Sequence, residues 1–321
     1  SYFFFFKHLV FVIIGIGLIF IFSYIDQENL YKISIYIFFV SLTLLFLVPI
    51  IGVEVKGSKR WLDIFFLPRL QPIELVKPFF IIVLSILLTF HKLKNFTLKF
   101  ILTLILTFII SFLLIIQPDL GQTLLICFTW MLLIFVSGVN LIFLSAISVI
   151  GLSLLLYFIF YVAKFEYIKN RILSFFNSET GTHNFQSDKA IESIISGGFF
   201  GKGIGEGTLK NKVPEAHTDY IISVISEEFG VIVIILILIL FLVFIFSIFK
   251  KVNIENDHKT KLILVGSASL ILIQAMIHIG VNIRLFPTTG MTLPFLSYGG
   301  SSIISTSLMS GIILNLTKRK I

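Results

Sequence analysis

Residues 231–249 read VIVIILILILFLVFIFSIF, a run without a single ionisable side chain. An α-helix rises 1.5 Å per residue, so a run of this length extends over about 28 Å, close to the hydrocarbon thickness of a bilayer. Strands of outer-membrane barrels alternate between apolar and polar side chains instead. The run therefore predicts a transmembrane helix, and the rest of the chain repeats the same pattern.

The composition of the whole chain agrees with a membrane protein. Of its 321 residues 57% are hydrophobic and 13% charged, whereas soluble domains carry about 25% charged residues. This excludes a soluble enzyme and a disordered chain, and the single cysteine, Cys127, excludes an internal disulfide. The net charge of +8 is scattered among apolar segments, so we expect lipid or a phosphorylated lipid as the partner and no nucleic acid.

Nine apolar runs are long enough to cross a bilayer. They are residues 9–24, 33–51, 76–90, 100–116, 120–137, 141–163, 220–249, 262–283 and 302–316. Because the backbone must satisfy its own hydrogen bonds in lipid, these runs predict helices. We therefore expect an all-α, polytopic transmembrane helix bundle that forms a single integral membrane domain over residues 1–321.

The connections between the runs predict the orientation. Nine spans place the two long loops, 52–75 and 164–218, on one side of the membrane together with 284–298. The other side has two lysine-rich short connections and a basic C-terminus, which is typical of a cytoplasmic face. The basic residues are Lys92, Lys94, Lys99, Lys250, Lys251, Lys259, Lys261, Lys318, Arg319 and Lys320. Residues 164–218 are thus expected to form a large extracytoplasmic loop. The chain would then start outside, and we expect an N-terminal helix to be missing from it.

Charged residues next to two of the spans are candidates for function, because charge within a span costs about 2.5–3.5 kcal/mol. Glu74 and Lys77 are three residues apart and predict a pair on one helix face. That pair could neutralise itself at the interface or line a polar cavity. Asp119, in the tight turn 117–119, is expected to cap the following helix.

The glycine-rich stretch 197–207, GGFFGKGIGEG, does not match a Walker phosphate loop. Ser196 replaces the first glycine, and Gly203 replaces the hydroxyl residue that follows the lysine. We expect no nucleotide cofactor. The remaining interpretation is a flexible backbone that can approach a ligand, with Lys202 as an anion contact.

The stretch 213–220 leads directly into the seventh span and contains Asp219. At 100° per residue Ser223 and Ser226 share its helix face, whereas Glu228 points the opposite way. We expect Asp219 at the helix N-terminus, where the macrodipole favours its ionised form, above a polar seam that indicates a wet cleft. The alternative is a simple N-cap aspartate.

A second polar stripe lies in the eighth span. Gln274, His278 and Asn282 follow each other at i, i+4 spacing, and Arg284 comes next. Such a stripe can bind helices together or form a cavity wall. Residues 287–302 are too rich in Pro and Gly to be helical, and irregular backbone at membrane depth must be buried in protein or face water.

Taken in order, six motifs resemble the shape, elongation, division and sporulation (SEDS) family of peptidoglycan glycosyltransferases, its division type more than its elongation type. They are GSKRWL (57–62), QPIELVK (71–77), QPDLGQ (117–122), GGFFGKGIGEG (197–207), PEAHTDYIISVISEEFG (214–230) and FPTTGMTLPFLSYGGSS (286–302). The resemblance runs from about residue 2 to residue 316. It implies a ten-helix fold, of which the first helix is missing here, in the bacterial cytoplasmic membrane.

The resemblance also implies an activity, the polymerisation of lipid II into glycan strands on the extracytoplasmic side. Asp219 corresponds to the family's essential carboxylate, and Glu74 with Lys77 to its buried pair. The chemistry needs one base and cationic charge, because a polyprenyl diphosphate leaves as a stabilised anion. We expect Asp219 to be catalytic. The expected substrate-binding residues are Glu74, Lys77, Arg60, Lys202, His217, Arg284 and Ser297.

Cofactor and partner expectations follow from the same chemistry. A Mg²⁺ or Mn²⁺ ion held by Asp219 and the diphosphate is an alternative to base catalysis. The resemblance implies a class B penicillin-binding transpeptidase and other division proteins as partners. The alternatives are a flippase for lipid-linked precursors, an elongation-type polymerase, another polyprenyl-linked sugar transferase, or a membrane scaffold.

Overall fold

The computed structural model describes residues 2–55, 58–63, 69–162, 165–176, 182–213 and 215–318. Of the residues used above, Gly57, Pro214, Arg319 and Lys320 lie outside these ranges. The elements are α1 (Tyr2–Tyr24), α2 (Gln27–Ile51), β1 (Val53–Val55), β2 (Ser58–Trp61), α3 (Pro72–Thr89), α4 (Phe96–Ile116), α5 (Leu120–Val136), α6 (Leu141–Tyr161), α7 (Glu166–Phe176), α8 (Thr182–Gly197), α9 (Leu209–Lys212), α10 (Ala216–Asp219), α11 (Ile221–Phe229), α12 (Val231–Ile254), α13 (His258–Asn282) and α14 (Gly300–Thr317).

Within these described ranges, eight helices are long and apolar enough to cross a membrane: α1, α2, α3, α4, α6, α12, α13 and α14. The fifth expected span is the shorter apolar helix α5. The prediction of a polytopic helical bundle is confirmed. The chain is a multi-pass membrane protein.

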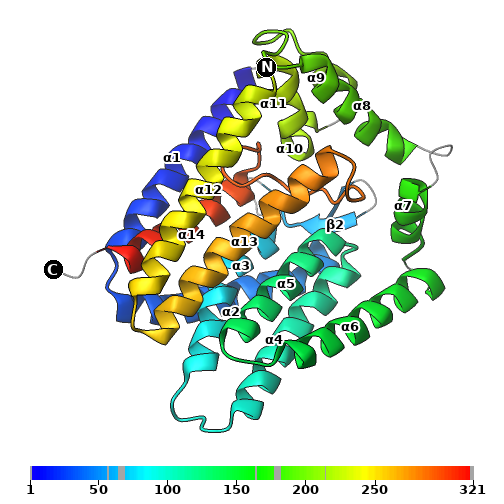
Figure 1. The fold of residues 1–321 in the computed structure, drawn as a ribbon. Helices are drawn as coiled ribbons and strands as arrows, with labels where there is room; N and C mark the ends of the chain where they lie inside the picture. The colour runs from blue at the N-terminus through cyan, green and yellow to red at the C-terminus, as the bar shows by residue number, and fades with distance from the viewer. Residues whose placement is uncertain are drawn as a thin grey trace. The chain divides into compact units, whose positions relative to one another are not determined.

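The chain divides into two compact units. The first comprises residues 1–139, 245–271 and 298–321, and the second comprises residues 140–244 and 272–297. In the first unit α3 is central and packs against α2, α4, α5 and α14, while α1 lies along α14 (Figure 1). Gly266 of α13 belongs to this unit, and a Cβ there would lie 2.7 Å from Ile81. Small residues let helices approach closely in membranes. Close packing matters there because the hydrophobic effect does not drive helices together within lipid.

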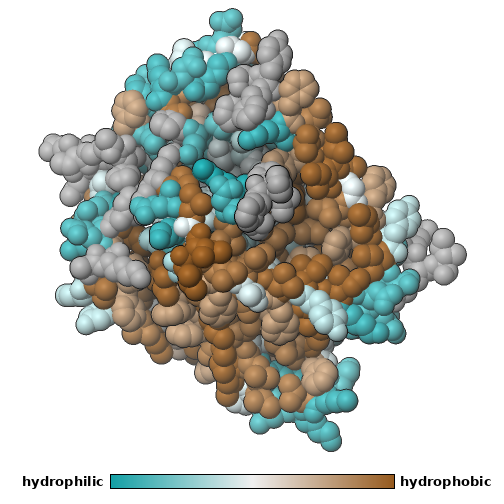
Figure 2. Space-filling view, turned by 180° about the vertical axis from the view of Figure 1, so that it is seen from behind, coloured by the Kyte–Doolittle hydropathy of each residue, from teal (hydrophilic) through white to brown (hydrophobic). Residues whose placement is uncertain are grey.

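The outer faces of the spans carry large apolar side chains. Phe108 of α4 is 67% exposed and Phe246 of α12 is 71% exposed. Much of the surface in Figure 2 is accordingly coloured hydrophobic. An apolar surface this extensive is incompatible with water as the only solvent, so lipid is the natural surrounding of these faces.

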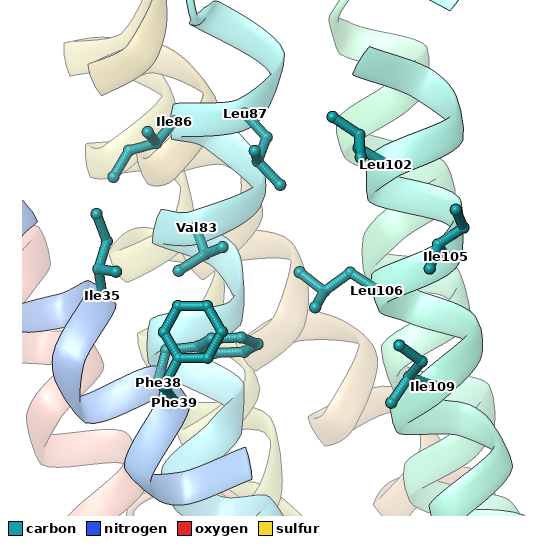
Figure 3. Close-up of a pocket in the computed structure, with 10 residues that line it drawn as sticks. All are labelled: Ile35, Phe38, Phe39, Val83, Ile86, Leu87, Leu102, Ile105, Leu106 and Ile109. Carbon is teal, nitrogen blue, oxygen red and sulfur yellow. The ribbon is translucent and has the colours of Figure 1, made fainter. Parts of the chain in front are cut away.

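An apolar pocket of about 310 Å³ lies between α2, α3 and α4 in the first unit (Figure 3). Phe38 and Phe39 of α2 line it, together with aliphatic side chains such as Val83 of α3 and Leu106 of α4. All ten lining side chains are hydrocarbon, so the pocket offers no group that could bind a sugar or act on it.

The seventh expected span, residues 220–249, is wrong as a single helix. It is interrupted at Gly230, where φ is +83°, and α11 and α12 lie on either side. A Cβ at Gly230 would lie 2.1 Å from the carbonyl oxygen of Phe199. Glu227, Glu228 and Gly230 interrupt the apolar run at this point, but such residues also occur within continuous helices. The break itself is fixed by the glycine-rich loop, which packs against Gly230.

A short hairpin was not expected from the sequence. β1 and β2 pair antiparallel, with Glu54 opposite Lys59. The second strand carries Arg60 to the turn between α4 and α5, where its Nε donates to the carbonyl of Gln117 at 3.3 Å. The hairpin thus places a cation beside the QPDLGQ motif.

Candidate functional site

Asp219 is the last residue of the single-turn helix α10. The expectation that it starts a helix is therefore wrong: Tyr220 separates it from α11, which begins at Ile221. The reason is the preceding turn, in which Glu215 adopts a left-handed φ of 60° and accepts a hydrogen bond from the Asp219 N–H at 3.0 Å. Asp219 is half-buried and its neighbour His217 is exposed.

Two side chains hold the end of α10 through its carbonyl groups. Asn282 Nδ2 donates to the carbonyl of Asp219 at 3.1 Å, and Ser297 Oγ donates to the carbonyl of Thr218 at 2.7 Å. The last carbonyls of a helix have no partner within it, so these bonds satisfy groups that would otherwise need water. They fix the backbone that carries the Asp219 carboxylate.

Asn282 is the centre of this arrangement. Its Oδ1 accepts hydrogen bonds from the backbone N–H and the hydroxyl of Ser223, at 3.2 Å and 2.7 Å. Its Nδ2 also donates to the carbonyl of His278 at 2.8 Å. Asn282 is fully buried. One amide thus ties α13 to α10 and to the first turn of α11.

The rest of the α13 stripe binds the irregular segment that follows it. Gln274 Nε2 donates to the carbonyl of Thr292 at 2.9 Å, and His278 Nδ1 lies 2.8 Å from the carbonyl oxygen of Met291. Of the two interpretations left open by the sequence, the structure supports a stripe that binds elements together. Residues 287–299 are irregular as predicted, but the prediction is wrong for residues 300–302, which form the first turn of α14.

The polar seam beneath Asp219 is not a wet surface. Ser223 and Ser226 are both fully buried, at 0% and 1% exposure. The prediction of a solvated cleft lined by these two serines is therefore wrong, because α11 turns them into the protein interior. Glu228 points away from them, as predicted, and pairs with Lys210 at 2.9 Å.

The glycine-rich loop is attached to the end of α11 through Glu227. Lys202 Nζ lies 2.9 Å from Glu227 Oε1, and the N–H of Leu209 donates to Oε2 at 2.9 Å. Burial alone would raise the pKa of Glu227, but hydrogen bonds from Thr208, Leu209 and Lys202 outweigh it and lower the pKa to about 2. Lys202, which the sequence predicted as an anion contact, thus forms an ion pair with the buried carboxylate of Glu227.

Two more expected binding residues belong to the second unit. Arg284 follows α13, and its NH1 lies 2.6 Å from Asp188 Oδ1 of α8. His217 precedes Asp219 by two residues, and partial desolvation of its ring lowers the pKa of the imidazole against the opposing effect of Glu215. The lowered pKa favours the neutral form of the imidazole. A neutral imidazole can donate or accept a hydrogen bond at a sugar hydroxyl.

The first unit contains the predicted Glu74–Lys77 pair. Lys77 Nζ lies 2.8 Å from Glu74 Oε1, and both side chains are buried. Gln122 Nε2 donates to the same oxygen at 2.9 Å. Glu74 Oε2 is buried, and no group among the described residues forms a hydrogen bond with it. The pair is therefore a buried polar centre between α3 and α5, not an exposed interfacial contact.

Asp119 joins this centre to the hairpin. Its side chain caps α5 by accepting from the N–H of Gln122, which confirms the predicted cap. Its Oδ2 also accepts from Gln71 Nε2 at 3.3 Å and lies 3.7 Å from Arg60 NH1. One continuous network thus links Arg60, Asp119, Gln122, Glu74 and Lys77. The sequence indicated its charged members, but not the glutamines that connect them.

The fit of a metal ion can be tested on the side chains present. No group of three or more His, Cys, Asp or Glu side chains that could hold an ion occurs in the described part of the chain. A divalent ion at Asp219 would therefore have to take most of its ligands from substrate or water, as Mg²⁺ often does.

The expected site residues divide between the two units. Arg60, Glu74 and Lys77 form one group, within the first unit. Asp219, His217, Ser297, Lys202 and Arg284 belong to the second unit. Asn282 was not among the expected site residues, although its place in the i, i+4 stripe was a usable signal. Nothing in the sequence linked it to Asp219.

Fold and site together define a class: a multi-pass helical membrane protein with a half-buried aspartate fixed between a large loop and the helices that follow it. The model of the FtsW, RodA and SpoVE family, described as cell cycle proteins, matches residues 1–320. The chain belongs to this family.

Relatives and solved structures agree with this membership. The chain is 32% identical over 305 residues to the probable peptidoglycan glycosyltransferase FtsW of Caulobacter vibrioides, covering 93% of this chain and 75% of that one. It is 35% identical over 328 residues to the protein of the same name in Coxiella burnetii, covering 97% and 86%.

Among solved structures, one chain of a peptidoglycan synthase complex that coordinates polymerization and crosslinking matches with a TM-score of 0.81 and 26% identity, covering 97% of this chain and 88% of that chain. The rod shape determining protein RodA of Thermus thermophilus matches with a TM-score of 0.70 and 26% identity, covering 97% and 86%.

Proposed function

We propose that this protein is a peptidoglycan glycosyltransferase of the division type, which polymerises lipid II into glycan strands. The observation that carries the proposal is Asp219, a half-buried carboxylate whose backbone is held by Asn282 and Ser297. The relatives of this protein are named as probable peptidoglycan glycosyltransferases. The site lies in a multi-pass membrane protein, which suits a substrate anchored in lipid by its polyprenyl chain.

In the proposed reaction Asp219 acts as the general base. Its carboxylate takes the proton from the 4-hydroxyl of the acceptor sugar, and the oxygen attacks the anomeric carbon of the donor. The new C–O bond forms with inversion to a β-1,4 linkage, while the bond to the diphosphate oxygen breaks and its electron pair leaves with the diphosphate. A positioned base contributes typically 10²- to 10⁴-fold. The fixed backbone of α10 supplies that position.

No second carboxyl group is needed as a general acid. A glycosidase protonates a poor leaving group, whereas a diphosphate leaves as a stabilised anion. The requirement is cationic charge, for which Lys202 and Arg284 are the candidates in the unit that contains Asp219. An ammonium group has three N–H donors, so pairing of the partly exposed Lys202 with Glu227 still permits contacts with phosphate oxygens.

A divalent ion is compatible with the same site. Asp219 would be its ligand from this chain, and the diphosphate and water would supply the remaining ligands. When bound, Mg²⁺ or Mn²⁺ would offset the charge that develops on the leaving diphosphate. His217 would contact the acceptor sugar from the exposed side of α10.

We further propose the cellular setting. The lysine-rich short connections favour the cytoplasm as their location, which puts Asp219 on the extracytoplasmic face of the bacterial inner membrane. The similarity to a chain of a complex that polymerises and crosslinks supports a class B penicillin-binding transpeptidase as partner, together with other division proteins.

The test is polymerisation of lipid II by the purified protein in detergent, where no bilayer exists for a flippase to act across. Asp219→Asn should abolish polymer formation, while Glu166→Gln, an exposed carboxylate of α7, should leave it unchanged. Thermal unfolding of both variants checks that they fold. Polymerisation at a near-normal rate by Asp219→Asn would refute Asp219 as the base, and absence of polymer from the unaltered protein would refute the activity.

A further inference from the structure

The glycine-rich loop between α8 and α9 exposes two large aromatic side chains. Phe199 is 73% exposed and Phe200 is 84% exposed. Neighbouring phenylalanines are costly to leave in water, since burial of one such side chain is worth about 1.5–3 kcal/mol. The catalytic proposal uses neither ring, so their exposure calls for an explanation of its own.

These two rings are presented by a tightly packed backbone. The N–H groups of Lys202 and Gly203 donate to the carbonyls of Glu227 and Glu228 at 2.9 Å and 3.0 Å. A Cβ at Gly201 would lie 2.3 Å from the carbonyl oxygen of Glu228. The loop is therefore pressed against the end of α11, and the exposure of its rings is built into the fold.

The same loop is joined directly to a membrane span. Val231 and Ile232, the first residues of α12, donate their N–H groups to the carbonyls of Gly198 and Phe199 at 3.0 Å and 3.4 Å. The first N–H groups of a helix lack partners within it, so the loop acts as the cap of α12. Phe199 therefore lies beside the N-terminal end of the membrane span α12.

The apolar surface continues from the loop onto the span. Ile232, Ile235 and Leu236 of α12 are 48%, 50% and 54% exposed, and as parts of a membrane span they face lipid. Two pairs of charges lie near the rings, Lys202 with Glu227 and Lys210 with Glu228. Paired charges oppose entry into the interface less than single ones would.

We infer that Phe199 and Phe200 insert into the interfacial layer of the lipid bilayer, as an extension of the lipid-facing surface of α12. Aromatic side chains gather at this layer because an apolar ring fits between the headgroups and the acyl chains. The insertion would fix the height of the loop, and with it the Lys202–Glu227 contact, relative to the membrane surface. The inference does not depend on the proposed activity.

The experiment measures the depth of spin labels in lipid nanodiscs. In a Cys127→Ser background, single labels are attached to Phe199→Cys, Phe200→Cys and, as the aqueous control, Lys212→Cys, an exposed position on α9. Collision rates with molecular oxygen, which enriches in lipid, and with a water-soluble nickel chelate are then compared for the three labels.

Insertion predicts that labels at 199 and 200 collide readily with oxygen and several-fold less with the chelate than the label at 212 does. The inference is overturned if the chelate reaches them as readily as the control, which would place the loop in water. It is equally overturned if both reagents are excluded from them, which would mean that protein covers the rings.

Discussion

The side-chain nitrogen of Asn282 lies 3.1 Å from the backbone carbonyl oxygen of Asp219. One residue earlier the carbonyl of Thr218 is held by Ser297 at 2.7 Å. Two side chains that are 15 positions apart in the sequence thus fix consecutive carbonyls at the end of one short helix. The carboxylate proposed as the base is therefore positioned through its backbone.

Loss of either hydrogen bond should affect turnover more than binding. For Asn282→Ala and Ser297→Ala we expect kcat to fall about tenfold, equivalent to about 1.4 kcal/mol, because the base moves relative to the acceptor hydroxyl. The KM for lipid II should change little. Steady-state polymerisation rates measure both constants.

The matched control is Ser85→Ala, a buried serine of α3 whose hydroxyl donates within its own helix to the carbonyl of Ile81 at 2.8 Å. It should leave kcat unchanged. A raised KM with normal kcat in Ser297→Ala would instead support the sequence-based expectation that Ser297 binds substrate.

Breaking the buried pair of α3 should destabilise the protein strongly. Lys77→Met leaves Glu74 charged in a buried position, at a cost of about 3–5 kcal/mol. The double variant Glu74→Gln, Lys77→Met removes both charges and should be less unstable than Lys77→Met alone. The unfolding temperatures of the two variants in detergent micelles show which of them is less stable. Equal or greater instability of the double variant would contradict this account.

The attachment of the glycine-rich loop should weaken in acid. The folded protein lowers the pKa of Glu227 from 4.5 to about 2, so its ionised form stabilises the fold. That contribution is complete above about pH 4.5 and is lost as the pH falls toward 2. Amide hydrogen exchange at Leu209, whose N–H donates to Glu227, should report the change as a falling protection factor.

Glu227→Gln should show weak protection at Leu209 already at neutral pH and little further change on acidification. Glu166→Gln serves as its control and should behave like the unaltered protein. Protection at Leu209 that is the same in all three proteins would show that Glu227 does not hold the loop.

The break between α11 and α12 should tolerate only glycine. Gly230→Ala introduces a Cβ 2.1 Å from the carbonyl oxygen of Phe199 at a φ of +83°. Left-handed backbone alone costs a non-glycine residue about 1–3 kcal/mol, and we expect a lower unfolding temperature together with release of the loop.

Gly151→Ala is the comparison for this substitution, because no atom of the described residues lies within 4 Å of a Cβ at Gly151 in α6. Alanine favours a helix over glycine by about 1 kcal/mol, so this variant should be neutral or slightly stabilised. An equal effect of the two substitutions would mean that the break is not set by Gly230.

The sequence by itself determined the fold class, the position of most spans, the pairing of Glu74 with Lys77 and the cap at Asp119. Each of these depends on local pattern: the length of apolar runs, i, i+3 spacing and the residues that start a helix. These signals act within a few residues of chain, so they can be seen without the fold.

Only the tertiary structure decided how Asp219 is held and where the seventh span breaks. Asn282 and Ser297 reach the end of α10 from 63 and 79 residues away in the chain, counted to Asp219 and Thr218. Gly230 is required because the Phe199 backbone packs against it. Hydrogen bonds and close contacts between distant segments produce no regular pattern in the sequence. Many segments contain a suitable donor or a small residue, and the sequence does not show which of them makes the contact.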